Sequence, residues 1–118
     1  MQADLGVLPP NDRDGCLQDV HWYCGSIGGG FQSYTIGNIL SAQFFAAALK
    51  AHPNILSQIA SGQFGTLHGW LTDKLYRHGR TLTPEAIVAG ATGSSMTMAP
   101  YLTYLRRKYG ELYSIPQF

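Results

Sequence analysis

Residues 15–51 read GCLQDVHWYCGSIGGGFQSYTIGNILSAQFFAAALKA, and no other part of the chain is as rich in reactive side chains. The first eight of these residues place polar and ionisable groups beside an aromatic ring: Gln18, Asp19, His21 and Trp22. A glycine-rich loop at 25–30 follows, and apolar residues then recur at helical spacing from about residue 32 to residue 51. The stretch therefore predicts a long helix with apolar residues on more than one side, preceded by a polar segment.

Helical patterns continue to the end of the chain. Apolar spacing and stop signals predict helices over 53–60 and 64–78, and one from Pro100 to a closing Gly110. Thr83-Pro84-Glu85 is typical of a helix start and Gly93 of a helix end. Residues 1–14 contain a double proline and predict an irregular lead-in, and residues 15–22 predict a strand or an extended loop. The predicted fold class is all-α: an irregular Gly/Pro-rich N-terminal arm followed by about five helices.

Composition limits the classes of function. The chain has 118 residues, a length typical of one domain, and a net charge of +1, so nucleic acid is an unexpected partner. Apolar runs fall short of the ~20 residues that span a bilayer, and the N-terminus does not have the pattern of a signal peptide. A cytoplasmic location without membrane contact, and free thiols at Cys16 and Cys24, are expected.

Charged residues make up only 13% of the chain, against about a quarter in an ordinary soluble domain. One explanation is that another chain or domain covers part of the surface. The alternative is a surface made of Gln, Ser, Thr and Gly, which are also plentiful.

Catalytic motifs are incomplete. The sequence has no His-Glu-x-x-His motif, and its histidines at 21, 52, 68 and 78 are never four residues apart, so no helix offers a histidine pair to a metal. The glycine loop does not have the spacing of a phosphate cradle, and a hinge or a loop beside a substrate is the preferred interpretation. Cys16 and His21 allow a cysteine nucleophile, but a small buried thiol is the simpler interpretation of Cys16. His21 and Tyr34 each keep two interpretations, as structural side chains or as hydrogen-bond donors to an oxyanion or carboxylate.

Residues Gly15–Trp22 resemble the Gly-x-x-Gln-Asp-x-His-Trp signature of the carboxypeptidase Taq family of zinc metallocarboxypeptidases. The resemblance follows the C-terminal end of that family in order and covers essentially the whole chain. Its further segments lie at 25–26, 34–38, 42–48, 77–79, 91–93 and 108–113. It implies that residues 1–118 are a single C-terminal subdomain, a fragment of a larger, mostly helical metallopeptidase fold. The family's His-Glu-x-x-His helix and its zinc-binding glutamate lie upstream, so the zinc-binding part is absent.

The resemblance also implies roles for individual residues. His21 would bind the C-terminal carboxylate of the substrate or its polarised carbonyl, and Tyr34 would donate to the oxyanion formed when zinc-bound water attacks. Gln18 and Asp19 would position His21 and the substrate, with Asp19 fixing the tautomer of the ring. Many relatives have Gly-Tyr-Phe-Pro-Thr-Tyr at 29–34, where this chain reads Gly-Gly-Phe-Gln-Ser-Tyr, so an earlier tyrosine is missing. Zinc belongs to the full-length enzyme, and this chain alone is expected to bind none.

Two hypotheses of function follow. In the first, the chain is the C-terminal part of a zinc-dependent metallocarboxypeptidase that removes C-terminal residues from peptides. It supplies one wall of the cleft, needs the missing N-terminal metal-bearing region as its partner, and is inactive alone. In the second, it is a stand-alone helical module, derived from that enzyme, that binds another protein or self-associates through exposed apolar faces.

Overall fold

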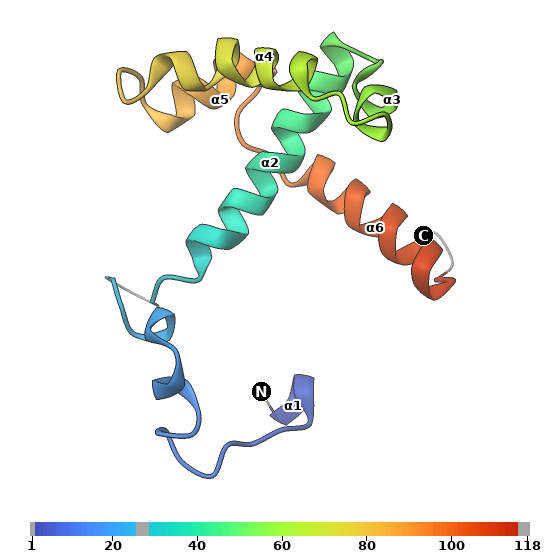
Figure 1. The fold of residues 1–118 in the computed structure, drawn as a ribbon. Coiled ribbons are helices and arrows are strands. Elements are labelled where there is room, and N and C mark those ends of the chain that lie inside the picture. Colours follow the sequence, from blue (N-terminus) through green and yellow to red (C-terminus); the bar gives the residue numbers. More distant parts are fainter. Residues whose placement is uncertain (1, 26–28, 116–118) are drawn as a thin grey trace. The chain divides into compact units, whose positions relative to one another are not determined.

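The computed structural model describes residues 2–25 and 29–115, and every regular element in those ranges is a helix (Figure 1). The chain divides into two compact units, Met1–Ile36 and Gly37–Phe118. The predicted all-α class is confirmed. The long helix α2 (Gln32–Ala51) has the predicted bounds; its first turn belongs to the first unit and the remainder to the second.

The first unit consists mainly of short turns. A four-residue helix, α1 (Gln2–Leu5), lies within the predicted irregular lead-in, so that prediction holds only for the residues after it. Neither a strand nor an extended loop forms at 15–22. Instead two 3-10 turns, η1 (Cys16–Gln18) and η2 (Val20–Trp22), flank Asp19, which is itself extended.

The first turn of α2 bonds to the glycine loop that precedes it. The helix begins at Gln32, and the Ser33 hydroxyl donates to the Gly30 carbonyl at 2.7 Å. The Gln32 side-chain amide likewise donates to the Gly29 carbonyl at 2.7 Å. The first turn of α2 is thereby tied to the end of the glycine loop.

The second unit contains the remaining helices. They are α3 (Ile55–Ala60), α4 (Gly65–Lys74), η3 (Tyr76–His78), α5 (Pro84–Thr92) and α6 (Ala99–Tyr113). Helix α5 starts and ends as predicted: the Thr83 hydroxyl accepts from the Ala86 N–H, and Gly93 is left-handed at φ 77°. Helix α6 does not close at Gly110, which lies inside it; the left-handed residue is Ser114, at φ 50°.

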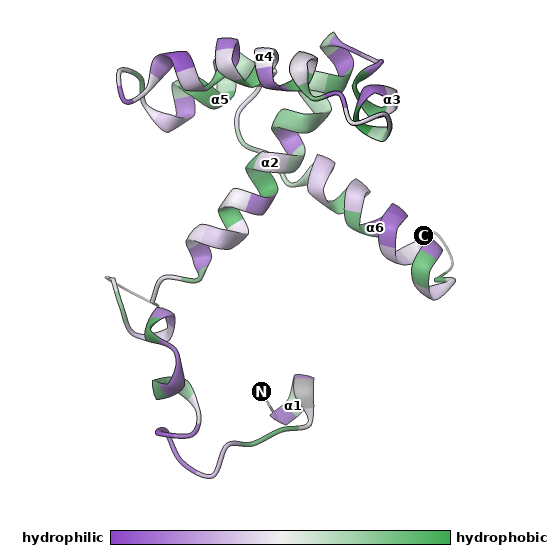
Figure 2. Cartoon of the chain, viewed as in Figure 1, coloured by the Kyte–Doolittle hydropathy of each residue, from purple (hydrophilic) through white to green (hydrophobic). Residues whose placement is uncertain are grey.

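The core of the second unit is built by α2, α3 and α4 around Ala48, Ile55 and Trp70. Partly buried side chains pack against these three: Phe44, Phe45, Ala47, Leu49, Ile59, Leu67, Leu71 and Ala91. Hydropathy follows this arrangement, since hydrophobic residues gather along the C-terminal half of α2 (Figure 2). Burial of these apolar side chains is the main force that holds the short helices α3 and α4 to α2.

Among the residues that the structure describes, Gln43 is the one buried polar side chain. Gln43 is only 3% exposed, and its amide nitrogen donates to the hydroxyls of Thr92 and Ser94 and to the carbonyl of Ser95. Its amide oxygen accepts from the Thr97 N–H at 2.9 Å. Gln43 therefore fastens the connection between α5 and α6 to the middle of α2.

Candidate functional site

The candidate site is centred on His21, which follows the extended Asp19. One carboxylate oxygen of Asp19 accepts from the backbone N–H of His21 at 3.0 Å and lies 2.8 Å from Nδ1 of its ring. The first of these bonds, then the second, lowers the pKa of the Asp19 carboxyl, because both favour its ionised form. Asp19 is thus a carboxylate held against the imidazole, the position that the resemblance implies.

The other ring nitrogen of His21 meets the hydroxyl of Tyr34, at a distance of 3.0 Å. Tyr34 stands in the first turn of α2, thirteen residues further along the chain, so the helix start brings it back to the η2 turn. The Phe31 ring lies against the same imidazole, with centroids 5.2 Å apart. Asp19, His21 and Tyr34 form one continuous chain of carboxylate, imidazole and phenol.

The linked side chains of Asp19, His21 and Tyr34 are open to solvent. The His21 side chain is 36% exposed and Tyr34 is 58% exposed. Neither residue is core, so the purely structural interpretation of Tyr34 as a buried side chain is wrong. A ligand can approach the phenol without any movement of a hydrophobic wall.

Two glycines hold the backbone of His21. The N–H of Gly30 donates to the His21 carbonyl at 2.7 Å, and Gly29 adopts φ 76°, a conformation that favours glycine. A Cβ atom on Gly29 would stand 2.2 Å from that carbonyl oxygen. The glycine loop, predicted as a hinge or a substrate-side loop, fixes His21 through these two residues; positions 26–28 of the loop lie outside the described residues. Consecutive glycines were the available sequence signal for this close approach.

Gln18 is turned elsewhere. Its side-chain amide donates to the Arg13 carbonyl at 2.5 Å, and none of the hydrogen bonds described for it reaches His21. No hydrogen bond described for Gln18 therefore supports its predicted role in positioning His21. Cys16 is an exposed free thiol, which corrects the interpretation of a buried one, and Cys24 is also free and half-buried.

Within residues 2–25 and 29–115, no three His, Cys, Asp or Glu side chains lie close enough together to hold a metal ion. None of the helices in the described ranges is long and apolar enough to cross a membrane.

Comparison with known proteins places the chain by sequence. Residues 1–109 match a family model of metallopeptidases, so the chain is related to that class by sequence. The model is that of carboxypeptidase Taq (M32) metallopeptidases, and the chain belongs to this family.

Relatives agree with this assignment. The chain is 37% identical over 92% of its length to Thermostable carboxypeptidase 1 of Thermus thermophilus, and 37% identical over 95% of its length to Carboxypeptidase 1 of Bacillus subtilis. It spans 21% and 22% of those two proteins. Among solved structures, the M32 carboxypeptidase of Deinococcus radiodurans R1 shares 56% identity with a TM-score of 0.86, covering 97% of this chain and 23% of that one. The helical fold is consistent with a piece of a larger helical protein.

Proposed function

We propose that the chain is the C-terminal part of a zinc-dependent metallocarboxypeptidase, and that it supplies one wall of the cleft in which C-terminal residues are hydrolysed from peptides. In this proposal residues 1–118 act as a single subdomain, and the metal-bearing residues belong to the part of the family fold that the chain does not match. A cytoplasmic location is part of the same proposal.

One observation carries the proposal: the carboxylate, imidazole and phenol of Asp19, His21 and Tyr34 are joined by hydrogen bonds and open to solvent. Such a set holds the imidazole and the phenol in place before the ligand arrives, which lowers the cost of binding and of oxyanion stabilisation. His21 and Tyr34 are the proposed catalytic residues, and Asp19 positions His21. Gln18 keeps a proposed part in substrate binding through its place beside Asp19.

A chimera tests the proposal. The matched residues of the Bacillus subtilis carboxypeptidase are replaced by this chain, and hydrolysis of an N-blocked dipeptide is measured with and without a chelator. The chimera is expected to be active, whereas the 118-residue chain alone is expected to be inactive. In the chimera, Tyr34→Phe is expected to lower kcat ~100-fold or more, because one donor to the oxyanion is lost.

Tyr76→Phe is the matched control, since this phenol is exposed on η3 in the second unit. It is expected to leave kcat unchanged. Chelator-sensitive hydrolysis by the isolated chain would show that a metal site exists within it, and an unimpaired Tyr34→Phe chimera would remove Tyr34 from the reaction.

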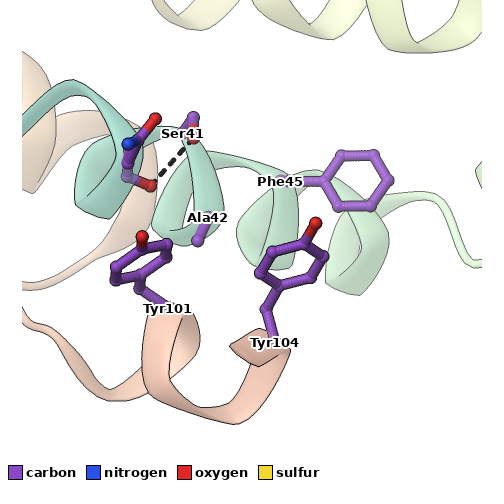
Figure 3. Close-up of a pocket in the computed structure, with 6 residues that line it drawn as sticks. Ser41, Ala42, Phe45, Tyr101 and Tyr104 are labelled. Atoms are coloured by element: carbon purple, nitrogen blue, oxygen red, sulfur yellow. Dashed lines mark hydrogen bonds between the residues drawn. The ribbon is translucent and has the colours of Figure 1, made fainter. Parts of the chain in front are cut away.

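A second candidate function, a self-associating or protein-binding module, is favoured by a hollow surface on α2 and α6. Tyr101 and Tyr104 of α6 face Ser41, Ala42 and Phe45 of α2 (Figure 3). Beside this hollow lies a groove of about 540 Å³, lined mainly by apolar residues of α2, α3 and α6. An apolar groove of this kind is typical of a surface that another polypeptide covers.

A further inference from the structure

We propose that the site binds an anionic oxygen only together with a proton, so that its carboxylate-binding form contains a protonated His21. The choice of a carboxylate as ligand rests on the proposed function. The coupling to a proton rests on the directions of the hydrogen bonds among Asp19, His21 and Tyr34.

Asp19 determines the tautomer of His21. Asp19 is ionised at neutral pH, because its pKa is lowered by the two hydrogen bonds from His21, and an ionised carboxylate only accepts hydrogen bonds. Nδ1 of His21, 2.8 Å away, must therefore carry a proton. A neutral imidazole has a single N–H, so Nε2 is then a bare acceptor.

The Tyr34 phenol is the donor in its bond to His21. The Tyr34 hydroxyl lies 3.0 Å from the bare Nε2, so it has to be the donor of that bond. The hydroxyl proton is used in the bond to Nε2, so the phenol oxygen offers an approaching ligand its lone pairs alone. In this state the three side chains present acceptors to an approaching carboxylate, and Asp19 adds a negative charge.

Protonation of His21 reverses the hydrogen bond to Tyr34 and removes the net negative charge. The imidazolium has two N–H groups, so Nδ1 still donates to Asp19 while Nε2 now donates to the Tyr34 oxygen. The phenol proton is released and can point to a ligand. The net charge of the Asp19–His21 pair changes from −1 to zero, which removes the repulsion. Binding therefore takes up one proton for each carboxylate that is bound.

The surroundings of the ring support this balance. Asp19 supplies the negative charge from the residue between η1 and η2, and Tyr34 is the titratable group that faces the ring from α2. The Cys24 thiol is the other ionisable group on the glycine-loop side, near Gly30, and both ring nitrogens already have other partners. Among the described contacts of the ring, none is with a lysine or arginine that would supply the missing donor.

The first test needs no ligand. The ring nitrogens of His21 are observed by ¹⁵N NMR on the whole 118-residue chain at about pH 8.5, where an ordinary imidazole is neutral. The expected spectrum has the proton on Nδ1 and none on Nε2. A proton on Nε2 would overturn the inference, because the phenol of Tyr34 would then already be free to donate.

The second test uses N-acetyl-alanyl-alanine as the carboxylate and its C-terminal amide as the neutral control. The peptide and Asp19 both remain ionised at about pH 5.5 and above, and an ordinary imidazole takes up a proton between about pH 8.5 and that pH. The acid is expected to bind at pH 5.5 and to weaken ~tenfold per pH unit once the ring is mostly neutral. Calorimetry in two buffers of different ionisation enthalpy is expected to give an uptake approaching one proton at the higher pH.

The outcomes separate the two claims. Binding of the acid with equal affinity at both pH values, and without proton uptake, overturns the coupling and leaves the proposed function standing. Absence of any effect of the acid on the His21 and Tyr34 resonances at pH 5.5 overturns carboxylate binding by these residues, whereas the proposed function is overturned by the chimera experiment.

A variant provides a check that a merely structural role would not satisfy. Asp19→Asn keeps the shape of the side chain, but an amide can either accept from Nδ1 or donate to it. The neutral ring can then place its proton on Nε2 and free the phenol, so the pH dependence of binding should flatten. Asp12→Asn removes a carboxylate from the same unit and should keep the full tenfold dependence. A tenfold dependence that survives in Asp19→Asn would contradict the proposal.

Discussion

At His21, four neighbours restrict one side chain and its backbone. Asp19 and Tyr34 occupy the ring nitrogens, Phe31 lies against the ring, and Gly30 bonds the carbonyl. Restriction of this kind keeps a binding side chain in one rotamer and reduces the entropy lost when a ligand binds.

Gly29→Ala tests the backbone part of this arrangement. A methyl group there meets the His21 carbonyl at 2.2 Å, and a φ of 76° is unfavourable for alanine. The free energy of unfolding is expected to fall by more than ~1 kcal/mol, with large shifts of the His21 and Tyr34 resonances. Gly37→Ala is the control: it lies inside α2 with nothing within 4 Å, and is expected to stabilise by ~0.5–1 kcal/mol. Unmoved resonances in Gly29→Ala would show that the loop does not hold His21.

Acid provides a second test at the residue scale. The pKa of Asp19 is lowered from 3.8, mainly by the His21 backbone N–H, so it is lower in the folded chain than in the unfolded one. The resulting stabilisation is complete above about pH 5 and is lost as the pH falls below 3.8 and through the folded value. The amide resonance of His21 is expected to shift in that range. A midpoint at or above 3.8 would mean that the two hydrogen bonds do not form in solution.

The sequence predicted this site in part. A resemblance over 15–22 and 34–38 pointed to Asp19, His21 and Tyr34, and the structure brings these three together. Their roles in binding and catalysis stay predictions. The consecutive glycines indicated a close approach of backbones, but they did not identify the His21 carbonyl as the neighbour, because conformational freedom alone does not specify a partner.

At the scale of elements, the connection between α5 and α6 depends on Gln43. Gln43→Leu keeps the volume but leaves the Thr97 N–H and the Ser95 carbonyl without their partner. Loss of ~1–3 kcal/mol in the free energy of unfolding is expected from denaturant titration. Ser41→Ala is the control, since its exposed hydroxyl donates to the Asn38 carbonyl of the same helix, and should change stability by less than ~0.5 kcal/mol. A Gln43→Leu variant as stable as wild type would contradict the role of the buried amide.

Helix boundaries show what local signals can and cannot give. Thr83 and Gly93 bracket α5 correctly, because a hydroxyl cap and a left-handed glycine act locally. Gly110 misled at α6: a glycine costs a helix only ~1 kcal/mol, and the chain continues to Tyr113. Gln43 was not predicted as a fastening residue, because its partners lie about fifty residues away in sequence.

At the scale of the whole molecule, low charge and an apolar groove predict association. The chain is expected to form dimers or larger species at high concentration, as measured by light scattering after size exclusion. Leu56→Lys adds a charge to the groove and should shift the mass toward the monomer. Phe64→Lys adds the same charge at an exposed site outside the lining of the groove and should not. A stable monomer of the wild-type chain at every concentration would rule out the self-associating module.

The two tryptophans of the chain fall one in each unit, and their surroundings are opposite. Trp22 is 52% exposed and stands edge-on to Phe31 with centroids 5.0 Å apart, whereas Trp70 is 6% exposed in the core. Their fluorescence should therefore separate into a red-shifted component that acrylamide quenches readily and a blue-shifted component that it scarcely reaches. Each unit carries its own optical reporter, so melting of the loop around His21 can be followed independently of melting of the helices.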